Sequence, residues 1–113
     1  MTDIKEITET LIKFRNARDW EQFHDSKNLA TAIAIEAAEL NELFLWKNSI
    51  DDIENVSKEK LAEELADVFS FAFLLASKNN LNVKDIVLDK IRKNNEKYPV
   101  AKAKGTAKKY DEL

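Results

Sequence analysis

Two residue types that are almost missing constrain the fold of this chain most strongly: its 113 residues include one glycine, Gly105, and one proline, Pro99. β-Sandwiches and barrels need turn residues about every 8–12 positions. Rossmann turns and P-loops need several glycines, which let backbone N–H groups approach phosphate. The sequence therefore excludes these classes and favours long helices joined by short connections.

Hydrophobic periodicity predicts four such helices and hence an all-α fold. Thr2 or Asp3, Ser26, Ser57 and Asn82 are suitable N-caps. From these caps the helices are expected to run to about residues 18, 46, 77 and 97, with a connecting loop over 47–56. Pro99 ends the last helix because proline disfavours helical geometry in the residue before it. We expect one domain over residues 1–113, an antiparallel four-helix bundle that includes a basic C-terminal tail at 98–113.

The third predicted helix is apolar on nearly all of its faces between Leu65 and Ala76. A helix of this kind is normally buried all round, whereas a bundle this small leaves one side of each helix exposed. The pattern therefore predicts that the helix also packs against a second copy of the chain. The alternative is a monomeric bundle with a partly apolar surface.

Composition narrows the functional classes further. The chain has 18 Lys and Arg against 21 Asp and Glu, a net charge of −3, which argues against a nucleic-acid partner. The longest apolar stretch is too short to span a bilayer, so we expect no membrane partner and a cytoplasmic location. With no cysteine and one histidine, His24, thiol chemistry and multi-histidine metal sites are excluded within one chain.

Two pairs of acidic residues stand beside apolar stripes on consecutive predicted helices: Glu36 with Glu39, and Glu64 with Asp67. An i,i+3 spacing puts both members of a pair on the same side of a helix. Four carboxylates at the edge of a core repel one another, and no lysine or arginine shares their stripes. A hard divalent cation would neutralise them, and oxygen ligands suit Mg²⁺ or Mn²⁺.

These four acidic residues have two other interpretations. They could be solvated surface residues, which is common for acidic pairs on helices. A di-iron carboxylate bundle is excluded, because it needs a Glu-x-x-His pair on each of two helices and His24 lies in a loop.

The two acidic pairs resemble the E-x-x-E…E-x-x-D pattern of the MazG-like superfamily of all-α nucleotide pyrophosphohydrolases. Four further segments narrow the resemblance to the dCTP pyrophosphatase branch of this superfamily: the aromatic loop at 18–24, residues 43–47, residues 97–99 and residues 108–113. It implies hydrolysis of a nucleoside triphosphate to the monophosphate and pyrophosphate, with dCTP or a 5-substituted dCTP as substrate. It also implies a homo-oligomer, a tetramer built as a dimer of dimers.

The resemblance further implies roles for individual residues. Glu36, Glu39, Glu64 and Asp67 would hold Mg²⁺, and Glu36 or Glu39 would accept a proton from the attacking water. The remaining substrate-binding residues would be Trp20, His24, Trp46, Phe71, Asn94 and Lys97, the last of them near phosphate.

Two alternative functions stay open at this point. One is a broader deoxynucleotide pyrophosphatase that acts on dUTP or oxidised purines. The other is a non-catalytic helical interaction module, which would have no need of four acids beside its core.

Overall fold

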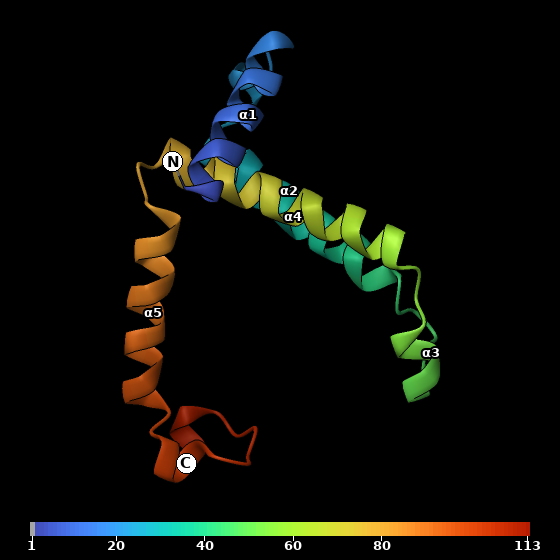
Figure 1. Cartoon of the computed structure of the whole chain (residues 1–113), viewed down its shortest axis with the longest axis vertical. Coiled ribbons are helices and arrows are strands. Elements are labelled where there is room, and N and C mark those ends of the chain that lie inside the picture. The colour runs from blue at the N-terminus through green and yellow to red at the C-terminus, as the bar shows by residue number, and fades with distance from the viewer. Residues whose placement is uncertain (1) are drawn as a thin grey trace. The chain divides into compact units, whose positions relative to one another are not determined.

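The computed structural model describes residues 2–113, and within this range the chain is helical with no strand (Figure 1). The all-α prediction is therefore confirmed. In chain order the elements are α1 (Asp3–Ala17), the 3₁₀-helix η1 (Glu21–Phe23), α2 (Ser26–Glu42), α3 (Ile50–Glu54), α4 (Lys58–Lys78), α5 (Val83–Lys97), α6 (Val100–Ala103) and the 3₁₀-helix η2 (Tyr110–Glu112).

Side-chain caps begin most of the long helices where the sequence predicts them. The Thr2 hydroxyl accepts the N–H of Lys5 at 3.2 Å, and α1 follows. The Ser57 hydroxyl accepts the N–H of Lys60 at 3.3 Å and begins α4. The side-chain Oδ1 of Asn82 accepts the N–H of Asp85 at 3.0 Å and begins α5. Each cap satisfies a backbone donor that has no partner inside the helix.

Three details of the predicted helices are wrong. Asp25, not Ser26, caps α2, because its carboxylate accepts the N–H of Asn28 at 2.6 Å. The same helix ends at Glu42 instead of reaching Trp46, and residues 43–46 form a turn. The expected loop over 47–56 contains α3, which Ser49 caps, and the basic tail contains α6 and η2.

The structure divides into two compact units, Met1–Asn80 and Leu81–Leu113. In the first unit α2 and α4 lie side by side and antiparallel (Figure 1). The start of α2 meets the end of α4, where the Asn79 amide donates to the Ser26 hydroxyl at 3.1 Å. Helix α1 packs against α4. Because α5 belongs to the second unit, the single domain and the four-helix bundle stay predictions.

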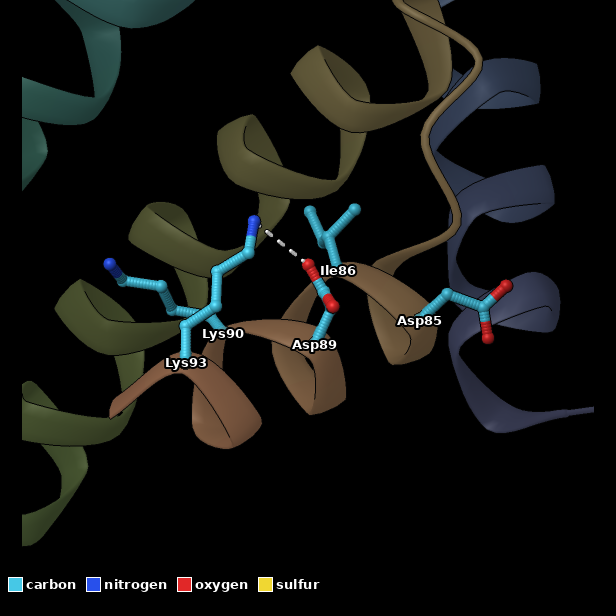
Figure 2. A pocket seen from close by; sticks show the side chains of 5 residues that line it. All are labelled: Asp85, Ile86, Asp89, Lys90 and Lys93. Atoms are coloured by element: carbon cyan, nitrogen blue, oxygen red, sulfur yellow. Dashed lines mark ion pairs between the residues drawn. The ribbon is translucent and has the colours of Figure 1, made fainter. Parts of the chain in front are cut away.

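The second unit is organised around α5 and an aromatic contact. The rings of Tyr98 and Tyr110 meet edge to face, with centroids 6.1 Å apart. A shallow depression on α5 is lined by Asp85, Ile86, Asp89, Lys90 and Lys93 (Figure 2). It contains no predicted site residue, and its Asp89–Lys93 ion pair at 3.1 Å is an ordinary helix-surface pair.

Few apolar side chains of the described residues are buried: Leu29, Leu74 and Ala76. Phe69 of α4 is 51% exposed although it lies on the helix predicted to be buried all round. Its ring stacks on that of Phe73, with centroids 5.7 Å apart, so the two form an apolar surface on α4. Between residues 2 and 113, no helix has the length and apolarity needed to cross a membrane.

Candidate functional site

Three acidic side chains from α2 and α4 converge at the seam between these helices. One carboxylate oxygen from each of Glu36, Glu64 and Asp67 lies within 4.8 Å of the other two. Glu39 is outside this group of three, yet it is within hydrogen-bonding reach of both Glu36 and Glu64. The antiparallel pairing of the helices therefore brings the two acidic pairs of the sequence together.

The electrostatics of the cluster show how unfavourable four neighbouring carboxylates are without a cation. Burial, the largest cause, raises the pKa of Glu36 from 4.5 to about 7, and a hydrogen bond with Glu39 adds to the effect. The negative charges of its acidic neighbours raise it further. Burial and a hydrogen bond with Glu39 likewise raise the pKa of Glu64. Both shifts mean that the cluster favours bound positive charge, either protons or a metal ion.

The unpaired atoms of the cluster fit a divalent cation. The Oε2 atoms of Glu36 and Glu64 are buried and have no hydrogen-bond partner within the described residues. Two oxygens bound to one Mg²⁺ at about 2.1 Å lie at most about 4.2 Å apart. Small side-chain rotations would therefore bring the three oxygens to ligand distance. The donor set is all oxygen, which suits a hard cation.

An aromatic contact lies one helical turn from the acids. The His24 ring meets the Phe71 ring edge to face, with centroids 6.3 Å apart. Phe71 lies four residues after Asp67 on α4, so both side chains project to one side of the helix. Burial, and then the positive charge of Arg15, lower the pKa of His24, so its ring is held neutral. The buried His24 Nδ1 has no hydrogen-bond partner within residues 2–113.

Trp20 stands at the entry to the loop that carries His24. Its ring meets that of Phe14 edge to face at 5.7 Å and remains 43% exposed. The short helix η1 then returns the chain toward α4. The amide of Asn28 donates to the Phe23 carbonyl at 2.9 Å and fixes the end of the loop. Trp20 and His24 are thus presented by one structured segment.

The structure separates Trp46 from the other predicted substrate-binding residues of its unit. Trp20 precedes α2 and Trp46 follows it, and a helix of 17 residues is about 25 Å long. Trp46 is 85% exposed and has a φ of +65°, a conformation that is unfavourable for a bulky residue. Such strain is often found at functional sites. Within one chain, Trp20 and Trp46 therefore lie at opposite ends of α2.

The two remaining predicted residues, Asn94 and Lys97, lie on the last turns of α5 in the second unit. The Lys97 ammonium group lies over the Tyr110 ring, 4.8 Å from its centroid. The role of both residues in substrate binding stays a prediction.

The sequence alone assigned no role at the site to three residues around the aromatic loop: Phe14, Arg15 and Arg18. Arg15 acts on His24 through its charge and pairs with Glu21 at 3.7 Å. Phe14 and Arg18 contact Trp20. The spacing of Phe14 and Arg18 could have indicated this contact. They stand four positions apart shortly before Trp20, and that spacing places them on one helix face.

Comparison with known proteins agrees with this geometry. Residues 31–113 match the sequence model of the MazG-like family. The chain is 35% identical to rat dCTP pyrophosphatase 1 over 97% of its own length and 67% of that protein. Human dCTP pyrophosphatase 1 is 34% identical over the same shares. A crystal structure of a pyrophosphatase from Archaeoglobus fulgidus superposes with a TM-score of 0.83 at 37% identity, covering 88% of this chain and 94% of that one.

These similarities decide between the classes of function that the sequence left open. The matched region includes both acidic pairs, and the related proteins are pyrophosphatases. An enzyme is therefore confirmed over a non-catalytic interaction module. The chain belongs to the MazG-like family and is a nucleoside triphosphate pyrophosphohydrolase.

Proposed function

We propose that this enzyme hydrolyses dCTP or a 5-substituted dCTP between the α- and β-phosphates, releasing the monophosphate and pyrophosphate. The observation that carries the proposal is the convergence of Glu36, Glu64 and Asp67 within 4.8 Å, beside the aromatic contact of His24 and Phe71. A triphosphate needs bound positive charge, and a base needs an aromatic surface. The names of the mammalian relatives support dCTP as the substrate.

In this proposal Glu36, Glu64 and Asp67 hold Mg²⁺, with Mn²⁺ as a substitute, and Glu39 completes the acidic shell. A bound divalent cation would neutralise the triphosphate and make an attacking water more acidic. Glu39 is outside the group of three, so its carboxylate stays available to accept the proton of that water. Glu36, on the same helix, is the alternative base.

The base would bind at the aromatic end of the site. Trp20 offers a half-exposed ring for stacking, and the Phe71 ring packs edge to face against His24. Because His24 is held neutral, its unpartnered Nδ1 can act as acceptor or donor according to its tautomer. A hydrogen bond between His24 and the polar edge of the base would favour one base over another.

In the same proposal, Trp46 of one chain contributes to the substrate site of a second copy. Trp46 is exposed at the far end of α2 from Trp20, and on α4 the half-exposed Phe69 ring stacks on the partly buried Phe73 ring. Exposed apolar surface of this kind marks interaction sites. We propose a homo-oligomer, a dimer of dimers, in the cytoplasm. The proposal keeps Asn94 and Lys97 as substrate-binding residues, Lys97 as a phosphate contact.

Incubation with dCTP and Mg²⁺, followed by identification of the products, tests the proposal. The expected products are dCMP and pyrophosphate, and chelation of the metal should stop the reaction. Products dCDP and phosphate would overturn the assigned bond. Faster turnover of dUTP or an oxidised purine triphosphate than of dCTP would replace the proposed substrate with the broader specificity.

A further inference from the structure

Phe14, Arg18 and Trp20 form a stacked group at the C-terminal end of α1. The guanidinium carbon of Arg18 lies 3.7 Å from the centroid of the Phe14 ring and 5.9 Å from that of Trp20. The Phe14 and Trp20 rings meet at 74°, with centroids 5.7 Å apart. Arg18 and Trp20 therefore pack around one aromatic ring, and each restricts the movement of the others.

The backbone holds this group in place. The N–H of Trp20 donates to the Arg15 carbonyl at 3.1 Å, and Asp19 adopts a φ of +55° to make the turn. The Gln22 side chain donates to the carbonyl and to the carboxylate of Asp19, at 3.0 and 3.1 Å. The Trp20 carbonyl also accepts the N–H of Phe23 at 2.9 Å, so its main chain is fixed on both sides, and its ring orientation depends on the side chains that it contacts.

Arg18 is free of the partners that usually occupy a surface arginine. Its Nη1 donates to the Phe14 carbonyl at 3.0 Å, one turn earlier in the same helix. Among the ion pairs of residues 2–113, none includes Arg18. Its planar group is committed to the aromatic ring and to the end of the helix. A lysine would keep a positive charge near the ring but would lose the planar stacking of the guanidinium group.

We propose that Phe14 and Arg18 are positioning residues for nucleotide binding, which hold the Trp20 ring in the orientation that stacks on the base. The inference rests on the proposed function, in which Trp20 contacts the base. A ring that is already ordered loses less conformational entropy when the base binds. Loss of either contact should therefore weaken binding of the nucleotide without slowing the chemical step.

Steady-state kinetics with dCTP test this role. Arg18→Gln and Phe14→Leu should each raise KM about 3- to 10-fold, a loss of the size expected for one side chain that is no longer preordered, and kcat should change less than twofold. Lys13→Gln is the matched control, because it removes an exposed positive charge from the same helix and should leave KM unchanged. An unchanged KM in both Arg18→Gln and Phe14→Leu would overturn the proposal.

Two further variants separate positioning from direct contact with the substrate. Arg18→Lys should be as defective as Arg18→Gln, whereas full rescue by lysine would mean that charge alone matters and would overturn the inference. In a Trp20→Ala background, Arg18→Gln should raise KM no further, because the residue that it positions is gone. An additive effect would contradict the proposal.

A spectroscopic measurement needs no turnover and keeps this inference distinct from the proposed function. In Trp46→Phe protein, Trp20 is the remaining tryptophan. Arg18→Gln in this background should lower its fluorescence anisotropy and increase quenching by acrylamide, while the far-ultraviolet circular dichroism stays unchanged. If wild-type protein hydrolyses no nucleotide, the proposed function fails whatever the anisotropy shows. If turnover occurs and Trp20 is equally ordered in both proteins, the positioning role fails alone.

Discussion

Glu36 on α2 and Glu64 on α4 face each other across a helix seam, and each has a buried Oε2 atom without a hydrogen-bond partner among the described residues. Their pKa values are raised chiefly because burial disfavours the charged form of a carboxyl group. Two acids of this kind would destabilise the fold if nothing bound them. The relationship therefore links stability, metal binding and catalysis in one cluster, and the following predictions separate these effects.

Removing a carboxylate from the cluster should abolish turnover while the chain stays folded. Glu36→Gln and Asp67→Asn should each reduce kcat/KM about 100-fold or more, because a bound cation supplies several kcal/mol of charge stabilisation. Both variants should also lose the increase in Tm that Mg²⁺ gives the wild type. Glu63→Gln is the control on the same helix, outside the group of three, and should retain most activity. Full activity of Glu36→Gln would contradict the metal site.

Without metal, the stability of the protein should fall as pH rises from about 4.5 to 7. In this window the unfolded chain loses the proton of Glu36 at its ordinary pKa of 4.5, whereas the folded chain keeps it until about pH 7. The folded state thus binds more protons, so the free energy of unfolding decreases with pH. Urea denaturation in a chelator at pH 5 and 7.5 should show a smaller decrease for Glu36→Gln than for the wild type. Equal pH dependence of the two proteins would refute this assignment.

Trp20 should contribute to substrate affinity through stacking. Trp20→Ala should raise KM for dCTP by about 5- to 150-fold, since stacking on a base is worth about 1–3 kcal/mol, whereas Trp20→Phe should retain part of the affinity. Both variants should keep wild-type affinity for Mn²⁺, because Trp20 is not part of the acidic group. If Trp20→Ala leaves KM unchanged, the base binds elsewhere.

Mixing two defective variants tests whether Trp46 acts on a site in another copy of the chain. Trp20→Ala and Trp46→Ala are each expected to be poor enzymes at low dCTP concentration. If the subunits of a 1:1 mixture pair at random into two-fold oligomers, about one quarter of all sites regain both tryptophans, which is about one half of the sites in the mixed pairs. Activity should therefore recover after the two proteins are unfolded and refolded together. No recovery, in a sample shown to contain mixed oligomers, would place both tryptophans of a site in one chain or remove Trp46 from it.

The apolar surface on α4 should be needed for association. Phe69→Glu puts a charge on this surface and should yield a smaller species in sedimentation velocity, because burying an unpaired charge in an interface is costly. Lys60→Glu also places a glutamate on α4, at an exposed polar position, and should leave the assembly intact. A wild-type protein that sediments as a monomer would contradict the oligomer itself.

Much of the secondary structure was readable from short stretches of sequence. α5 spans Val83–Lys97 as predicted, and α1 and α4 end within a residue or so of their expected positions. Helix periodicity and caps act through contacts within about four residues, so a local pattern is sufficient. The errors at Asp25 and in residues 43–56 arise where two adjacent cap residues compete, or where a polar stretch contains one short turn of helix.

The acidic pairs were visible for the same local reason, since residues three apart share a helix face. The family resemblance grouped Glu36 with Glu64 and Asp67, and His24 with Phe71, but helix period alone could not show that these side chains meet. The packing of Arg18 against Phe14 beside Trp20 was not foreseen at all. The first two contacts depend on the antiparallel register of α2 against α4 and on the path of the loop before α2. Register and loop path are fixed by packing between residues distant along the chain, and helix period carries no information about that packing.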